Sequence, residues 1–247
     1  MEQPAARREL VKYSLRIWER GWVANHDGNL SLRLGRDRIL TTPTAFSKQE
    51  VTEEDLLVVE ISSGKVLSGR HRPFSELGLH LEYFQTRKDV QAVVHAHPPT
   101  ASGFSVAGIE VEPRITAEAV VSLGDRIPLA PLAPPGGLEA RTQIRYLGRL
   151  FDALLLSNHG VITCGDSLEQ AYLRMELVEH LARMQQQAML LGNLRLIPDA
   201  WVQDLLGKRK KAGLGPEARG QKAPPRKDIS KLPVEDVIAA LVEQLKG

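Results

Sequence analysis

The chain has 247 residues, of which 43% are hydrophobic, and a formal net charge of +2. One sizeable core is expected, whereas two large domains are not. Cys164 is the only cysteine, which excludes an intrachain disulfide. No stretch approaches the roughly 18 apolar residues of a membrane span, and the N-terminus lacks the apolar segment of a signal peptide. A cytoplasmic protein without a membrane contact is therefore expected.

The first part of the chain predicts a helix, four strands and a second helix. An apolar stripe at helical spacing begins at Leu10. Ser75 is a suitable N-cap for a helix that ends near Thr86. Residues 62–65 read as a turn between the last two strands. The strands are predicted at Leu30–Leu34, Arg38–Leu40, Leu56–Ile61 and Val66–Leu67, and the stripe consists of Leu10, Tyr13, Ile17 and Trp18.

A short apolar run ends in a pair of histidines. Residues 90–97 are rich in β-branched side chains and are stopped by Pro98, which indicates a strand. Because side chains alternate along a strand, His95 and His97 should project from the same face. Two imidazoles at that spacing can bind one ion at the zinc–nitrogen distance of about 2.0–2.1 Å. A lone histidine in such a strand is more often a core or edge residue, so the pair is the informative feature.

A second apolar run, residues 153–157, leads into Asn158, His159 and Gly160. It offers a third imidazole at another strand end, and three histidines with an open fourth position are typical of catalytic zinc sites. Spacing alone does not show that His159 joins the pair. Glu76 opens the helix before the first run and is a candidate base or displaceable fourth ligand. A further long helix is predicted over residues 167–191, with a capping-box sequence at its start.

The composition changes after Leu206, where the folded body is expected to end. Between Lys208 and Asp228 there are eight basic and two acidic residues, a net of +6 that leaves −4 for the rest of the chain. Four glycines and three prolines fall between Gly207 and Asp228. Residues 207–231 are therefore predicted to form a disordered, extended linker. Nucleic-acid binding is not favoured, because no aromatic or folded recognition element accompanies the basic run.

Residues 232–247 are amphipathic again. Pro233 suits the first position of a helix, and the acidic pair after Val234 favours the N-terminal end of the helix dipole. An isolated helix of this length is marginal in water, so this tail should fold only against a partner. Its apolar residues recur at helical spacing and are Val234, Val237, Ile238, Leu241, Val242 and Leu245.

Five short motifs carry a family resemblance. In order and spacing they resemble the class II aldolase/adducin family over about residues 7–195, and within it the zinc-dependent L-fuculose-1-phosphate aldolases. Each motif alone is weak, but five in this order make a chance match improbable. The motifs are Gly28-Asn29-Leu30-Ser31, Thr41-Thr42-Pro43-Thr44, Pro73-Phe74-Ser75-Glu76, Val94-His95-Ala96-His97 and Ser157-Asn158-His159-Gly160.

The resemblance implies an α/β fold of three layers, α/β/α, with a mostly antiparallel central sheet in a catalytic domain of residues 1–206. It also implies a C4-symmetric homotetramer with active sites at the subunit interfaces. Zn²⁺ would be bound by His95, His97 and His159. The implied reaction is reversible cleavage of a ketose 1-phosphate, such as L-fuculose 1-phosphate, to dihydroxyacetone phosphate and lactaldehyde. Glu76 would move the proton at C3.

The phosphate-binding part of the resemblance is weaker. The matching positions are Asn29, Thr44, Ala45, Phe74 and Ser75, which would use hydroxyl, amide and backbone N–H groups. Ala45 stands where glycine is usual and is expected to donate its N–H if its φ is negative. Phe74 replaces a serine, so one hydroxyl is absent from this set.

A third departure concerns the acid beside the leaving aldehyde. Ala117 stands where the fuculose-phosphate enzymes have a tyrosine from the neighbouring subunit. Glu118 is the candidate auxiliary acid, although it could instead cap a helix. His80 shares a helical face with Glu76 and is a candidate partner of the site.

Other readings of the same residues remain open. A sugar-phosphate dehydratase, 4-epimerase or decarboxylase of the family would use the same metal site. A non-catalytic, adducin-like scaffold is a different class, but such heads lose the metal ligands that this chain retains. The tail Leu232–Gly247 resembles an encapsulation peptide that would bind a shell protein of a bacterial microcompartment. The alternative is a helix that docks back onto its own tetramer.

Overall fold

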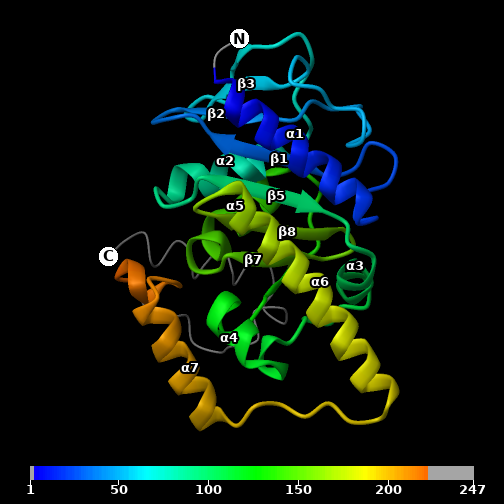
Figure 1. The fold of residues 1–247 in the computed structure, drawn as a ribbon, viewed down its shortest axis with the longest axis vertical. Helices are drawn as coiled ribbons and strands as arrows, with labels where there is room; N and C mark the ends of the chain where they lie inside the picture. The colour runs from blue at the N-terminus through cyan, green and yellow to red at the C-terminus, as the bar shows by residue number, and fades with distance from the viewer. Residues whose placement is uncertain (1–2, 222–247) are drawn as a thin grey trace.

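The computed structural model describes residues 3–221, and an eight-stranded sheet forms the centre of this part of the chain (Figure 1). The strand order is β4-β3-β2-β1-β5-β8-β7-β6. Every neighbouring pair is antiparallel except β6 and β7. The strands are β1 (Asn29–Arg33), β2 (Arg38–Thr41), β3 (Leu57–Glu60), β4 (Val66–Ser68), β5 (Ala92–Ala96), β6 (Leu129–Ala130), β7 (Ala153–Leu156) and β8 (Gly160–Gly165).

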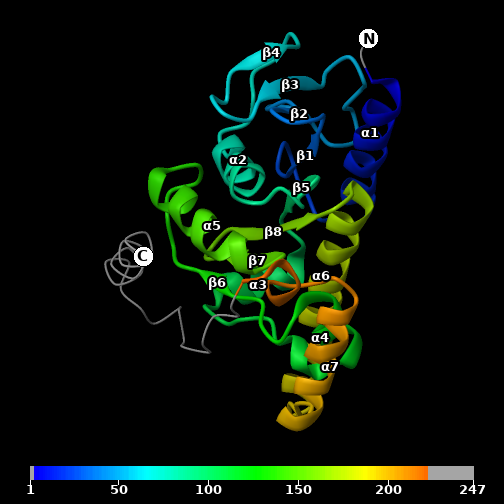
Figure 2. The ribbon, with the colours of Figure 1, turned by 90° about the vertical axis from the view of Figure 1, so that its left-hand side faces the viewer.

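Helices cover both faces of the sheet, which confirms the predicted three layers. Figure 2 shows α2 and α5 on one side and α1 and α6 on the other. Each face has its own apolar cluster, one of which also includes side chains of α3 and α4. The helices are α1 (Pro4–Glu19), α2 (Leu77–Thr86), α3 (Pro99–Val106), α4 (Ala117–Leu123), α5 (Leu138–Leu150), α6 (Leu168–Leu190) and α7 (Asp199–Lys211).

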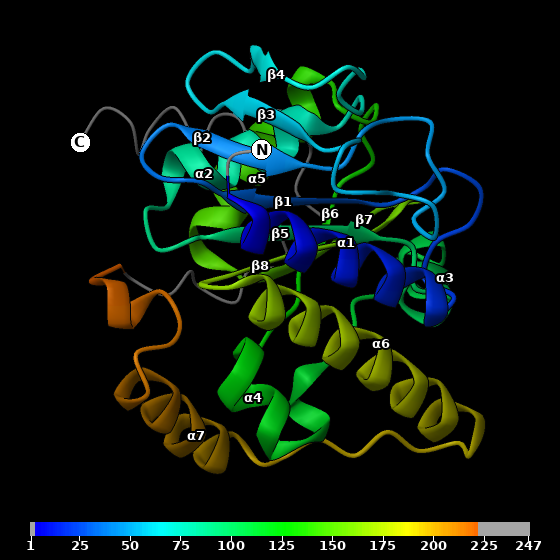
Figure 3. The ribbon, with the colours of Figure 1, turned by 45° about the horizontal axis from the view of Figure 1, so that its top comes forward.

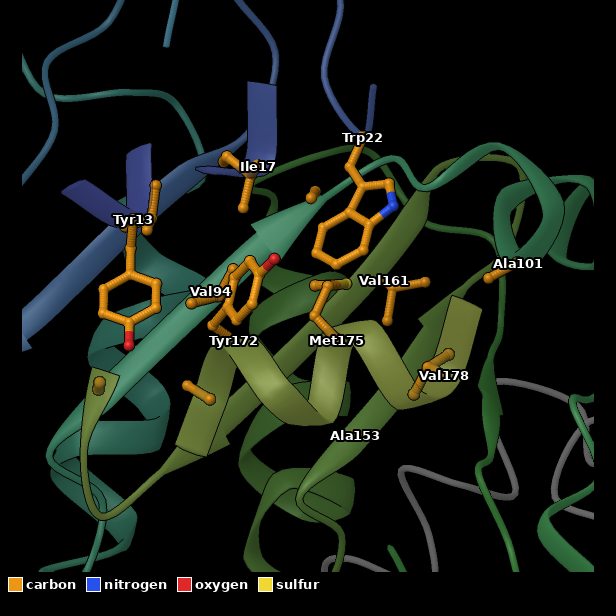
Figure 4. Packing of buried hydrophobic residues seen from close by; sticks show 14 of the residues in the cluster. Tyr13, Ile17, Trp22, Val94, Ala101, Ala153, Val161, Tyr172, Met175 and Val178 are labelled. Carbon is orange, nitrogen blue, oxygen red and sulfur yellow. The ribbon is translucent and has the colours of Figure 1, made fainter. Parts of the chain in front are cut away.

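Aromatic side chains join α1 to α6 over the central strands (Figure 4). The ring of Tyr172 on α6 lies 5.2 Å from that of Tyr13 on α1 and 5.4 Å from that of Trp22. Met175, one turn further along α6, is fully buried and lies between Trp22 and Val161 of β8 (Figure 4). Burial of such side chains contributes about 1.5–3 kcal/mol each, so this layer holds β5 rigidly in the middle of the sheet.

The sequence predicted that two helices begin at serine caps, Ser75 and Ser167. Ser167 caps α6 as predicted, because its hydroxyl accepts from the N–H of Gln170 at 3.1 Å. The prediction for Ser75 was wrong, since α2 begins at Leu77 and Glu76 occupies the N-cap position without a side-chain cap. The expected four strands of the first part are all present, with ends that differ by one residue.

The start of the predicted extended linker was also wrong. Residues 207–211 are the end of α7, which packs beside α4 (Figure 3). A short 3₁₀ helix, Glu217–Arg219, follows. Arg209 is 4% exposed, and its Nη2 lies 2.9 Å from Asp152 Oδ2. The folded body therefore extends beyond Leu206, because basic residues of this segment are ion-paired with the core.

Cys164 is buried in β8 and unpaired. Among residues 3–221, no helix combines the length and the apolar character that crossing a membrane requires. The amphipathic tail, residues 232–247, lies outside the described residues.

Candidate metal and proton-transfer site

The histidine pair lies at the end of β5, in the middle of the sheet. His95 is on the strand, paired with Asn29 of β1 on one side and Ile162 of β8 on the other. His97 follows the last strand residue, and its N–H donates to the Trp22 carbonyl at 2.8 Å. Pro98 ends the strand because it cannot donate a backbone hydrogen bond. Strand pairing on both sides thus holds His95, and one backbone hydrogen bond holds His97.

The third histidine lies in the tight connection between β7 and β8. The N–H of His159 donates to the Leu156 carbonyl at 3.1 Å, which closes the turn. Asn158 adopts φ 54°, a left-handed conformation that asparagine tolerates better than most residues. At Gly160 an added Cβ would lie 2.5 Å from Cδ2 of His97, so only glycine fits there. The Asn-His-Gly sequence therefore places His159 against the pair.

The three imidazoles converge, as the sequence predicted for His95 and His97 and as the resemblance implied for His159. One nitrogen from each lies within 4.8 Å of the other two. The Nε2 atoms of His95 and His97 are 3.1 Å apart. Ligands about 2.0–2.1 Å from a tetrahedral ion are separated by about 3.3 Å, so this spacing fits one shared zinc ion.

Hydrogen bonds and electrostatics leave lone pairs for a metal. Nδ1 of His95 lies 2.9 Å from the Val161 carbonyl, which can only accept, so Nδ1 carries the proton and Nε2 has a free lone pair. Burial and the other imidazoles lower the pKa of His97 to about 4. Burial also lowers the pKa of His159. Against its burial, the Glu76 carboxylate raises the pKa of His95. The lowered pKa values keep His97 and His159 neutral, and a neutral His95 protonated at Nδ1 adds Nε2 as a third nitrogen donor, a set that suits zinc.

Glu76 reaches the same point from the N-terminus of α2. Its Oε2 lies 3.3 Å from His95 Nε2, and its Oε1 lies 3.3 Å from His159 Nε2. The Asn29 amide donates to Oε2 at 3.3 Å. Burial alone would raise the pKa of Glu76, but His95, His159 and Asn29 hold it well below its usual range. An ionised carboxylate therefore faces the histidines, where it can ligate a metal or take a proton.

The predicted phosphate-binding residues lie on two loops that are joined to each other. Pro43 and Pro73 form an isolated bridge, and the N–H of Thr44 donates to the Arg72 carbonyl at 3.0 Å. Next along each loop, Ala45 and Ser75 are both exposed. The bridge joins the two loops at Pro43 and Pro73, and Asn29 contacts Glu76, the residue that follows Ser75.

Two of these positions behave differently from expectation. Ala45 has φ 62°, not the negative value that N–H donation was expected to need. It keeps a left-handed backbone that glycine adopts freely and that costs alanine roughly 1–2 kcal/mol. Phe74 is 7% exposed and packs edge-on against His80, so its side chain belongs to the core. Any ligand contact at Phe74 is left to its backbone.

Glu118 is exposed in the first turn of α4, and the helix cap is supplied by Thr116, whose hydroxyl accepts from the N–H of Ala119 at 3.3 Å. The alternative role of Glu118 as a helix cap is therefore taken by Thr116. Its role as an auxiliary acid remains a prediction.

Of two further side chains near the site, Asp27 was not identified from the sequence, whereas Lys48 was a candidate there to replace the hydroxyl absent at Phe74 or else a solvated charge. Asp27 Oδ2 lies 3.4 Å from Nδ1 of His97, where it can orient that imidazole. Lys48 is 1% exposed and donates to the carbonyls of His26 at 3.2 Å and Phe46 at 2.8 Å. Burial lowers the pKa of Lys48 to about 8. The lysine braces the loop before it and does not stand in for the hydroxyl that a serine would offer at position 74.

Comparison with known proteins identifies relatives of this chain. The family model for the Class II Aldolase and Adducin N-terminal domain matches residues 8–186. An L-fuculose phosphate aldolase of Methanococcus vannielii is 34% identical over 178 residues, 72% of this chain and 93% of that protein. A 3-oxo-tetronate 4-phosphate decarboxylase of Pectobacterium atrosepticum is 31% identical over 183 residues, 72% of this chain and 83% of that protein.

Solved structures give the same result. A structure of an L-fuculose 1-phosphate aldolase superposes with a TM-score of 0.78 at 27% identity, over 85% of this chain and 98% of the other.

Proposed function

Because the chain belongs to the Class II Aldolase and Adducin N-terminal domain family and is an enzyme of the lyase class, we propose that it is a zinc-dependent aldolase. Its substrate is a ketose 1-phosphate, L-fuculose 1-phosphate or a similar sugar, cleaved reversibly to dihydroxyacetone phosphate and lactaldehyde. The observation that carries the proposal is the ionised Glu76, 3.3 Å from Nε2 of both His95 and His159. A carboxylate beside a metal triad is what proton transfer next to a carbonyl requires.

The chain's own residues account for the proton movements at C3. In cleavage the C3–C4 bond breaks, C3 gains a proton and the C4 hydroxyl loses one as it becomes the aldehyde, so the protons balance. The ionised Glu76 first takes up a proton, equivalent to the one lost from the C4 hydroxyl, and delivers it to C3; in the reverse direction its carboxylate removes the C3 proton. Asn29 holds that carboxylate by its amide. Zinc bound by His95, His97 and His159 would supply a Lewis acid that stabilises negative charge on the substrate oxygens.

Phosphate binding falls to the two joined loops. Thr44 and Ser75 offer hydroxyls, Ala45 and Phe74 offer backbone N–H groups, and the Asn29 amide has a second hydrogen to donate. Support comes from the bridge between Pro43 and Pro73, which keeps the loops together. The low affinity of any single contact is offset because several converge on one anion.

A decarboxylase acting on a related sugar acid phosphate is the second candidate. It is favoured by the relative of Pectobacterium atrosepticum and by Phe74, which stands where the aldolase pattern has a hydroxyl. The same metal and glutamate would serve it. An epimerase, a dehydratase and an adducin-like scaffold have no comparable support in these contacts.

Assembly and location are further parts of the proposal. The chain forms a C4 homotetramer in the cytoplasm, in which a neighbouring subunit, or Glu118, supplies the acid missing at Ala117. Residues 222–231 then link this body to the tail, Leu232–Gly247, which binds a microcompartment shell protein. Deleting the tail should leave activity and tetramer intact and abolish co-localisation with shells. Loss of the tetramer would instead show that the tail docks on its own subunits.

The deciding experiment measures dihydroxyacetone phosphate release from L-fuculose 1-phosphate and L-rhamnulose 1-phosphate by the zinc-loaded enzyme. Glu76→Gln should keep stoichiometric zinc and lose release, whereas His95→Ala should lose both. Release of carbon dioxide from 3-oxo-tetronate 4-phosphate, without cleavage of either sugar, would establish the decarboxylase instead.

A further inference from the structure

His80 is a fully buried polar residue that the proposed mechanism does not use. It lies one turn after Glu76, on the side of α2 that faces β1, and is 0% exposed. Its Nδ1 is 2.8 Å from Oγ of Ser31, and its ring packs against Phe74 with ring centres 5.0 Å apart. These contacts fix the position and the plane of the imidazole.

The neighbouring hydroxyls favour one ring nitrogen of His80 as the one that carries the proton. Thr41 donates its single hydroxyl proton to the Leu30 carbonyl at 2.9 Å. The hydroxyl oxygens of Ser31 and Thr41 are 2.8 Å apart, and with the Thr41 proton on the Leu30 carbonyl Ser31 is the donor in that pair. In this arrangement the proton of Ser31 is committed, and Nδ1 of His80 donates to Ser31. Burial lowers the pKa of His80 to about 3, so the ring carries no second proton.

In this tautomer the other nitrogen of His80, Nε2, carries a lone pair and can only accept a hydrogen bond. It is buried and has no hydrogen-bond partner among the described residues. Asn29 has a similar atom, because its Nδ2 must face the Glu76 carboxylate and its Oδ1 is then buried without a partner. Asn29 and Ser31 alternate onto the same face of β1, the face that contacts α2. Two buried acceptors without a donor, Nε2 of His80 and Oδ1 of Asn29, therefore belong to side chains in the contact between α2 and β1.

Buried acceptors without a donor are rare in native proteins and usually indicate a bound donor. We propose that Nε2 of His80 is a built acceptor of the active site that binds one O–H donor, either a bound water or a hydroxyl of the sugar phosphate. The sugar-hydroxyl source rests on the proposed function, whereas the water source does not.

Two substitutions separate this role from a purely structural one. His80→Gln places an amide near the position of Nε2, so it retains an acceptor there and loses the bond to Ser31. His80→Asn reaches only the position of Nδ1, so it retains the bond to Ser31 and loses the acceptor. A structural role predicts that Asn is the better replacement, and the proposed role predicts that Gln is.

The tautomer and the water are tested on zinc-loaded protein without substrate. Nitrogen-15 NMR should show His80 protonated at Nδ1 and bare at Nε2. A crystal structure should show a water within hydrogen-bond distance of Nε2 if water is the donor, and this water should persist with bound dihydroxyacetone phosphate. A protonated Nε2 would overturn the proposal even if the enzyme proves to be an aldolase.

Two probes test the sugar hydroxyl as the donor. Calorimetry should show dihydroxyacetone phosphate binding about 10-fold more weakly to His80→Asn than to wild type, with His80→Gln close to wild type. Hydroxyacetone phosphate, which lacks that hydroxyl, should bind all three proteins alike. Equal binding of both probes to all three proteins, together with no water at Nε2, would refute the proposal.

Discussion

Asp152 is the residue whose loss should destabilise the fold most clearly. It is 1% exposed, and its carboxylate lies 2.8 Å from Arg87, 2.9 Å from Arg209 and 3.3 Å from Arg174. Asp152→Asn keeps the shape but leaves these buried guanidinium groups without their shared carboxylate. Removing one partner of a buried ion pair costs about 3–5 kcal/mol. We therefore expect about 4 kcal/mol less stability, a large part of the 5–15 kcal/mol typical of a folded domain.

Urea denaturation at fixed protein concentration measures this change, since subunit association would otherwise shift the midpoint. Asp204→Asn is the matched control, because Asp204 is exposed on the same helix as Arg209. Burial would raise the pKa of Asp152, but Arg174, Arg87 and Arg209 hold it well below its usual range. Below about pH 4 the unfolded chain binds a proton that the folded chain does not. Wild type should therefore lose this stability on acidification, and Asp152→Asn should not.

A double-mutant cycle locates the effect. Arg209→Met alone removes one cation and leaves Asp152 paired with Arg87 and Arg174, so it should cost less than Asp152→Asn. The double variant should be less than additive by about 0.5–3 kcal/mol, because the unpaired Arg209 is removed as well. An Asp152→Asn protein within about 1 kcal/mol of Asp204→Asn would refute the reasoning.

Three further predictions concern the site and its supporting loop. Zinc at 100-fold excess over its dissociation constant should stabilise the protein by about 2.7 kcal/mol in thermal unfolding, and His159→Ala should abolish the shift. Gly160→Ala should weaken zinc binding in chelator competition, since its Cβ would meet His97 at 2.5 Å, whereas Gly103→Ala, with nothing within 4 Å, should not. Burial lowers the pKa of Lys48 to about 8 in the folded chain. Between about pH 8 and about pH 10.4 the unfolded chain therefore binds more protons than the folded chain. Urea stability should rise over that range in wild type; a rise of equal size in Lys48→Met would contradict this.

The elements that the sequence predicted well are those set by local pattern. The strand ending at His95 and His97 follows from β-branched residues and a proline stop, and the long helix after Ser167 follows from its cap. Ser75 failed as a cap because Glu76 takes that position and points its carboxylate at the histidines. A functional contact overrode a local preference at this point.

The contacts that spacing within one segment could not establish depend on pairing between distant segments. His159 joins the pair only because β8 lies beside β5, and Asp27 meets His97 only because the chain before β1 returns to that edge. His80 was predicted on the face of Glu76, but the direction of its protons depends on Ser31 and Thr41 of two other strands. Periodicity within one segment cannot carry this information.

The basic segment after Leu206 shows why composition misjudged the end of the folded body. Charge-rich sequence with few apolar residues predicts disorder, because solvated charges do not promote burial. Arg209 is nevertheless buried, and Arg219 lies 3.7 Å from Asp152, so these charges complete the pairing of a carboxylate in the core. A net charge counted over a segment does not distinguish cations in solvent from cations that balance an acid elsewhere. In the sequence, Asp152 is a single acidic residue among apolar neighbours just before β7. A carboxylate buried at such a position needs cationic partners from elsewhere in the chain.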